Sequence, residues 1–161
     1  MSQILTAQDL LDHICNQILE IDKCIRFAGF ANDMGTIIVA QHRDVLMSVE
    51  KKKEHPLLTK NELELSAIES VLRMVTRKDM TPKLGKPIYS FTLYEKVKRA
   101  TILLENSNNN DCPPILMISF DNNNEAGTFQ EYIILNDILP FVSYYFSRIF
   151  PTHSSTYVET R

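Results

Sequence analysis

The side chains most able to do chemistry in this 161-residue chain are carboxylates near its C-terminal third. Asp121, Asn123 and Glu125 alternate, and Gly127 follows them. Oxygen ligands at alternate positions are typical of a calcium-binding loop. Here, however, the glycine comes one position late, and Tyr132 stands where the bidentate glutamate belongs. We therefore interpret the segment as a polar turn, with ion binding by Asp121–Glu125 as the alternative.

The histidines and the recognisable motifs give no sign of catalysis or of a metal site. The four histidines are scattered without the clustered spacing that a structural zinc site requires; they are His13, His42, His55 and His153. The chain contains no P-loop, no G-x-G-x-x-G, no H-E-x-x-H and no G-x-S-x-G. The sequence thus predicts a protein that is not an enzyme and that has no cofactor and no metal.

The cysteines point to a reducing compartment. Cys15, Cys24 and Cys112 are odd in number and widely spaced, and no Cys-x-x-Cys pair exists. Buried, reduced thiols in a cytoplasmic protein are the simplest interpretation. No apolar run approaches the ~20 residues that span a bilayer, and the N-terminus does not resemble a signal peptide. We therefore expect no membrane association.

Basic residues near one predicted hairpin form a candidate partner-binding site. Lys96, Lys98 and Arg99, with Lys83 and Lys86 nearby, could hold a phosphate or an acidic protein surface. A solvated hairpin tip explains the same residues, since mixed surface charge is normal. The net charge of -3 argues against a nucleic-acid partner, because such proteins usually carry a basic domain.

Two apolar runs around Asn32-Asp33-Met34-Gly35 predict a β-hairpin, with strands over Cys24–Ala31 and Thr36–Gln41. Asn, Asp and Gly tolerate the positive φ angles of a tight turn. Gly29 within the first strand indicates a bulge or a close approach of backbones. We expect Arg26 to point to solvent or towards a carboxylate.

Three segments have helical periodicity. Thr6 and Asp9 fit a capping box before a helix over Ala7–Ile21. Thr59 and Glu62 form a second box, before a helix that continues to about Met80, where Thr81-Pro82 stops it. The apolar stripe on this second helix is wide for a single core contact, so we expect it to meet a partner as well. The stripe comprises Leu65, Ile68, Val71, Leu72 and Val75, widened by Leu63, Ala67 and Met74.

The last helix follows an apolar stripe from Ile138 to Ile149, and Pro140 lies within it. Because proline lacks an N–H, we expect a kink or a restart near Asn136. Further strands are predicted over Ile88–Tyr94, Val97–Leu104 and Ile115–Phe120, the last covered on both faces. The lysine-rich connection 43–58 is interpreted as a solvated turn.

The resulting order is α-β-β-α-β-β-β-α, an α+β domain with a five-stranded, mainly antiparallel sheet and helices on its faces. The length favours one domain, over residues 1–151, followed by a flexible tail over 152–161.

This order resembles the roadblock family, the relatives of dynein light chains, and more narrowly its single-domain archaeal members. The carrying segments are IRFAGFANDMGTIIVAQHR (Ile25–Arg43), the helix Leu63–Arg77 and the hairpin Tyr89–Leu103. The resemblance implies a profilin-like fold with sheet order 2-1-5-4-3. It also implies homodimers that pair the third strand and the second helix across a two-fold axis, and roles in regulating or scaffolding small GTPases.

These observations lead to a hypothesis of a dimeric, non-enzymatic signalling or scaffold protein, whose partners are itself and a small GTPase or another signalling protein. An exposed edge strand is a template for pairing, so a second copy would cover it. The candidate dimer edge comprises Ile88, Tyr89, Ser90, Phe91, Thr92, Leu93 and Tyr94. The alternative is a small-ligand sensor with a pocket between the sheet and the connection 43–58.

Overall fold

The computed structural model describes residues 5–43, 59–76, 81–85, 88–95, 97–104, 115–121 and 131–149. The lysine-rich connection, most of the Asp121–Glu125 loop and the predicted tail 152–161 lie outside these residues. What the sequence predicts for them therefore stays a prediction, including the single-domain boundary at residue 151.

Five strands form one antiparallel sheet in the order β2-β1-β5-β4-β3. Their bounds are β1 Ile25–Ala31, β2 Ile37–His42, β3 Tyr89–Leu93, β4 Val97–Leu103 and β5 Ile115–Asp121. Both the α+β class and the predicted strand order are confirmed. β5 lies in the middle of the sheet, and β2 and β3 lie at its two edges.

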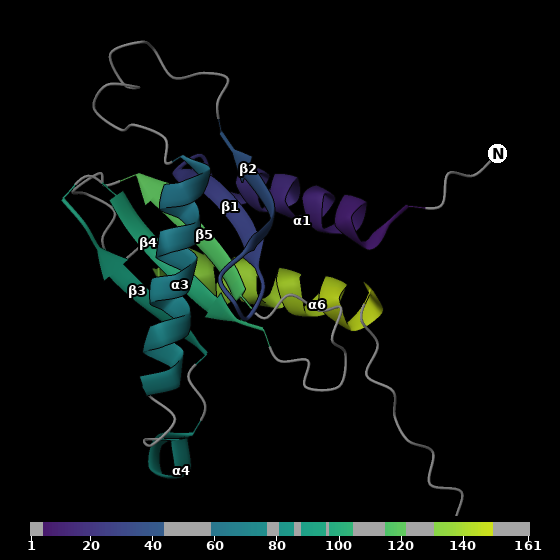
Figure 1. Ribbon diagram of the computed structural model, residues 1–161. Coiled ribbons are helices and arrows are strands. Elements are labelled where there is room, and N and C mark those ends of the chain that lie inside the picture. Colours follow the sequence, from purple (N-terminus) through teal and green to yellow (C-terminus); the bar gives the residue numbers. More distant parts are fainter. Residues whose placement is uncertain are drawn as a thin grey trace, which may run out of the picture.

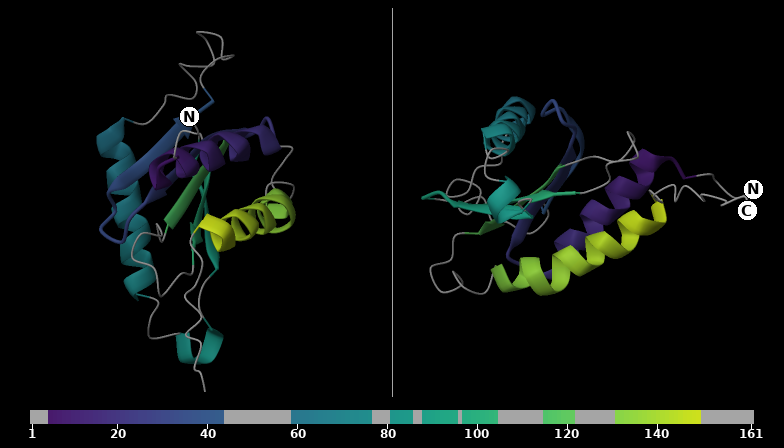
Figure 2. Two further views of the ribbon diagram at one scale, coloured as in Figure 1. Left: turned by 90° about the vertical axis from the view of Figure 1, so that its right-hand side faces the viewer. Right: turned by 90° about the horizontal axis from the view of Figure 1, so that it is seen from below.

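Helices cover both faces of this sheet. α1 (Ala7–Ile21) and α6 (Leu139–Ile149) lie side by side on one face, and α3 (Lys60–Thr76) lies on the other (Figures 1 and 2). The Thr6 hydroxyl accepts the N–H of Asp9, and the Asp9 carboxylate accepts the N–H of Thr6, so the predicted capping box starts α1. Thr59 and Glu62 cap α3 in the same way.

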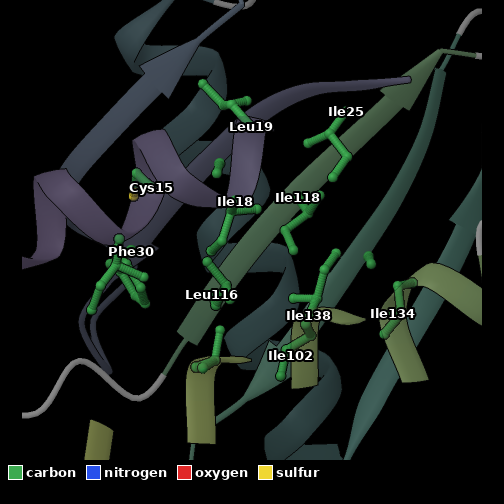
Figure 3. Packing of buried hydrophobic residues seen from close by; sticks show 14 of the residues in the cluster. Cys15, Ile18, Leu19, Ile25, Phe30, Ile102, Leu116, Ile118, Ile134 and Ile138 are labelled. Atoms are coloured by element: carbon green, nitrogen blue, oxygen red, sulfur yellow. The ribbon is translucent and has the colours of Figure 1, made fainter. Parts of the chain in front are cut away.

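The core lies on both sides of β5. Figure 3 shows Cys15 and Ile18 of α1 and Ile138 packing towards Leu116 and Ile118 of β5. On the opposite face Ile115 and Met117 pack with residues of α3. The continuous apolar run of β5 is thus buried on both faces, as its composition predicts.

A bulge in β1 changes which side chains share a face. The register of β1 against β5 shifts between Ile25 and Phe27. Ile25 therefore packs in the α1–α6 core, and Phe27 packs in the α3 core. Arg26, at the bulge, is only 6% exposed, so the expectation that it reaches solvent is wrong. Neighbouring atoms come close to the Gly29 backbone, as its glycine predicts: a Cβ there would lie 2.6 Å from Phe27 Cζ and 3.1 Å from the Val39 carbonyl oxygen.

Proline positions alter two helix ends. A π-helical turn, Ile134–Ile138, precedes α6, and the Leu139 N–H donates to the Ile134 carbonyl. This wider turn ends two residues before Pro140, which has no N–H to offer the preceding turn. The chain is helical without a break from residue 131 to residue 149, so of the two predicted outcomes, a kink or a restart near Asn136, the restart does not occur. By contrast Thr81-Pro82 opens a short helix, α4 (Thr81–Leu84), where the sequence predicts only the end of the preceding one, because proline suits a first helical turn.

Candidate functional site

The predicted dimer edge lies at the edge of the sheet. β3 has one neighbouring strand within the described sheet, β4, and pairs with it from Tyr89↔Ile102 to Leu93↔Lys98. Phe91 points to the α1–α6 face, where its ring lies 6.2 Å from that of Phe120. The edge position is confirmed, and pairing with a second copy stays a prediction.

Every second residue of β3 turns its backbone N–H and C=O groups away from β4. At one end the Leu103 N–H donates to the Ile88 carbonyl, and at the other the Tyr94 N–H donates to the Val97 carbonyl. In an antiparallel ladder such hydrogen-bonded positions alternate. Residues 88, 90, 92 and 94 thus turn their peptide groups towards β4, and residues 89, 91 and 93 turn theirs towards the outer edge. Leu93 is also 65% exposed, so this end of the edge is apolar as well as open.

The two candidate basic residues that the structure describes, Lys98 and Arg99, lie on opposite faces of the sheet. Lys98 is 5% exposed and pairs with Phe120, on the α1–α6 side of the sheet. Arg99 lies on the α3 side, where its guanidinium contacts the Ser66 hydroxyl and lies 5.4 Å from the centre of the Tyr94 ring. Alternation along β4 could have revealed this from the sequence, since neighbouring residues of a strand face opposite ways. Lys96 lies outside the described residues.

α3 is held on the sheet by contacts on both of its sides. Ser66 touches Arg99 of β4 on one side. On the other side Gly35, in the β1–β2 turn, approaches Ile68 so closely that a Cβ would lie 2.6 Å from Ile68 Cγ1. Between these two contacts Leu63 and Ala67 are buried against the sheet.

This orientation corrects the predicted burial of the α3 stripe. Leu63 and Ala67, expected only to widen the stripe, are buried, and Val71 of the stripe is half-buried against the same core. Leu65, Ile68 and Leu72 are exposed, and the side chains of Met74 and Val75 lie outside what the structure describes. The reason is geometric, because one helix can turn only about a third of its circumference to a sheet. The sequence shows a wide stripe but not which part of it the sheet covers.

The described residues form no metal-ligand cluster, and they bury the Cys15 thiol. Among them no group of three or more His, Cys, Asp or Glu side chains is placed to bind a metal ion. Cys15 is fully buried in α1, and burial raises the pKa of its thiol far above the usual value. No helix in the described part of the chain has the length and apolarity needed to cross a membrane.

Solved structures share this arrangement of strands and helices. MglB from Myxococcus xanthus superposes with a TM-score of 0.59 at 9% identity, covering 92% of this chain and 96% of that one. The gliding protein MglB from Thermus thermophilus superposes with a TM-score of 0.54 at 12% identity, covering 91% and 87%. This chain has the MglB fold.

The strand order of this fold is the order 2-1-5-4-3 that the sequence predicts. A Roadblock/LC7 domain from Streptomyces avermitilis reaches a TM-score of 0.49 at 7% identity, over 83% of this chain and 98% of that domain. No protein-family model matches the chain, and no curated protein matches it. The likeness to MglB is therefore one of fold, and the partners of this chain have to be argued from its own surfaces.

Proposed function

We propose that this protein is a non-enzymatic signalling or scaffold protein that works as a homodimer joined through β3. The observation that carries the proposal is the outer edge of β3, which directs the peptide groups of Tyr89, Phe91 and Leu93 away from β4. A second copy related by a two-fold axis would place the same groups opposite them and continue the sheet across both copies.

The role of such a dimer is an adaptor or regulator of a small GTPase in the cytoplasm. The roadblock resemblance of Ile25–Arg43 and Tyr89–Leu103 implies this class of partner, and the MglB fold is consistent with it. Reduced cysteines fit the compartment, since neither Cys15 nor Cys24 takes part in a disulfide in the described part of the chain.

Replacing Leu93 by proline tests the dimer selectively. The Leu93 N–H points outwards, so proline removes a donor from the edge and leaves the bonds to β4 in place. By symmetry each dimer loses two hydrogen bonds, at about 1 kcal/mol each. The dimer dissociation constant should therefore rise about 30-fold, since about 1.4 kcal/mol corresponds to a factor of ten.

Light scattering and sedimentation over a concentration series give the dissociation constant. The matched control is Thr92→Pro, whose lost N–H points towards β4, so this variant should lose folding stability instead. A wild-type protein that is monomeric at tens of micromolar, a range well above ~1 μM affinities, would refute the proposal. So would a Leu93→Pro variant that dimerises as tightly as the wild type. Co-purification from the native cell then shows whether the bound protein is a GTPase.

A further inference from the structure

We propose that Lys98, Arg26 and Arg43, here called the sheet-end cations, form a binding site for a phosphate group at one end of the sheet. The inference is independent of the proposed dimer, because none of the three residues belongs to β3. Lys98 is the only one of the sequence-predicted basic residues in this set.

Strand pairing brings the three cations to the same end of the sheet. Lys98, the second residue of β4, lies opposite Phe120 of β5, which lies opposite Ile25 at the start of β1. Arg26 follows Ile25, and its carbonyl accepts the N–H of Arg43, which directly follows β2. The arrowhead of β5 marks this end of the sheet in Figure 1. Two strand spacings separate β4 from β1, about 10 Å, a gap that two long side chains can bridge around one oxyanion.

The sheet-end cations belong to the face covered by α1 and α6. Lys98 lies on that face through its place in β4, as described above. Phe27 and His42 pair on the opposite face, where Phe27 packs with α3. Because side chains alternate along a strand, the next pair, Arg26 and Arg43, turns to the α1–α6 face.

The contacts of Arg43 agree with this placement. Its Nε donates to the Ile25 carbonyl at 2.9 Å, and its Nη2 donates to the Asp22 carbonyl at 3.1 Å. Asp22 is the residue at which α1 ends. The guanidinium is therefore fixed by backbone carbonyls at the end of α1, and its positive charge is not used by a carboxylate in these contacts.

The burial of Lys98 is the observation that points to a ligand. Lys98 and Arg26 are both more than nine-tenths buried, which is uncommon for charged side chains. No hydrogen bond or ion pair joins Lys98 to another residue in the described part of the chain. An ammonium group taken out of water without a counter-charge is costly, so a bound anion would stabilise the folded protein.

The carboxylates near this end do not balance the sheet-end cations. Asp22 is half-buried, and its carboxylate accepts the N–H of Cys24 at 2.8 Å. Asp121 stands one position beyond the Lys98 row, opposite Val97. Other charged residues nearby are exposed, so water and salt screen them; they are Glu20, Lys23, Glu95 and Glu131. In the Lys98 row and the adjoining end of α1, three buried or half-buried cations thus face one half-buried carboxylate.

This charge balance favours a doubly charged oxyanion. Guanidinium and ammonium groups form their strongest hydrogen bonds with ionised oxygens, and a guanidinium offers paired N–H groups that match a phosphate. A carboxylate brings a single charge and would leave the site positive. The ligand is therefore a phosphate group, either as the free ion or as a phosphate monoester.

Isothermal titration calorimetry at constant ionic strength tests the site with three probes: inorganic phosphate, phosphoserine and acetate. The variants are Lys98→Met and Arg26→Met, which remove one charge each, and Lys98→Arg, which keeps it. The matched control is Arg99→Met, because Arg99 follows Lys98 directly but lies on the opposite face, against Ser66.

We expect the wild type to bind phosphate saturably. Lys98→Met and Arg26→Met should each raise its dissociation constant about tenfold, the loss of one charge-assisted hydrogen bond. Lys98→Arg should stay within about threefold of the wild type, and acetate should bind about tenfold more weakly than phosphate. Arg99→Met should bind phosphate as the wild type does.

Urea denaturation gives a second readout that a merely structural role of Lys98 would not produce. In phosphate-free buffer Lys98→Met should be at least as stable as the wild type, because it removes a buried charge. Added phosphate should then stabilise the wild type and leave Lys98→Met unchanged. If Lys98→Met does not fold, Arg26→Met and Lys98→Arg decide the question.

The two phosphate probes identify the source of the ligand. Phosphoserine that binds as tightly as inorganic phosphate supports a site for a phosphorylated partner, and binding of inorganic phosphate alone supports a site for the free ion. Four results would overturn the proposal: no saturable binding of either probe, equal affinities of Lys98→Met and the wild type, an equal loss on Arg99→Met and Lys98→Met, or acetate binding as tightly as phosphate.

Discussion

The contact between the β1–β2 turn and α3 predicts an unusually large cost for adding one methyl group. Gly35 has a φ of +82°, and a Cβ there would lie 2.6 Å from Ile68 Cγ1 and 2.9 Å from the Ile68 backbone nitrogen. Gly35→Ala therefore combines a strained backbone with a collision against the backbone of α3. We expect α3 to shift or the turn to distort.

Gly85 provides a matched control, because its φ of +78° is nearly the same and no atom lies within 4 Å of the position that a Cβ would take. An alanine in the left-handed region costs about 1 kcal/mol. Overpacking adds about 2 kcal/mol where neighbouring backbone has to move. Gly35→Ala should thus lower the free energy of unfolding by about 3 kcal/mol, and Gly85→Ala by about 1 kcal/mol.

Urea denaturation measures both variants, and thermal unfolding should agree, at about 2–4 °C per kcal/mol for a chain of this size. Adding Ile68→Ala to Gly35→Ala removes one of the colliding atoms, so the double variant should cost less than the sum of the two single changes. Equal losses for Gly35→Ala and Gly85→Ala would show that the turn does not touch α3.

Two further predictions concern ionisation. Hydrogen bonds from Thr6 and Thr59 lower the pKa values of Asp9 and Glu62 from 3.8 and 4.5, so the folded protein binds fewer protons than the unfolded chain. These two carboxylates stabilise the folded protein above pH 4.5, and this stabilisation is lost as the pH falls through their lowered pKa values. Asp9→Asn and Glu62→Gln should therefore flatten the acid side of a curve of the free energy of unfolding against pH, measured with urea. Thr6→Val, which keeps the Asp9 carboxylate but removes the hydroxyl that donates to it, should have part of the same effect, and an unchanged curve would contradict the capping box. Cys15 should react with iodoacetamide only as fast as the protein unfolds, because burial raises the pKa of its thiol and blocks access; rapid labelling of the folded protein, read by mass spectrometry, would contradict the packing of α1 on the sheet.

Much of the local structure follows from the sequence alone. α1 begins and ends at the predicted residues, Ala7 and Ile21, because its capping box and its periodicity are contained within one short segment. The reversal at Gly35 and the two-sided burial of β5 follow in the same way. In each case the determining forces act between residues close in the chain: a positive φ, an N-cap hydrogen bond, or a run of apolar side chains.

The tertiary structure decided which way side chains face. Arg26 is buried because a bulge, set by the pairing of β1 with β5, shifts the alternation. Lys98 and Arg99 are separated by the two faces of β4, and the exposed row on α3 follows from how Ser66 and Gly35 fix that helix. The edge position of β3 depends on which strand lies beside it, which periodicity does not encode. Such outcomes depend on contacts between distant segments, and those contacts determine the β3 edge on which the proposed function rests.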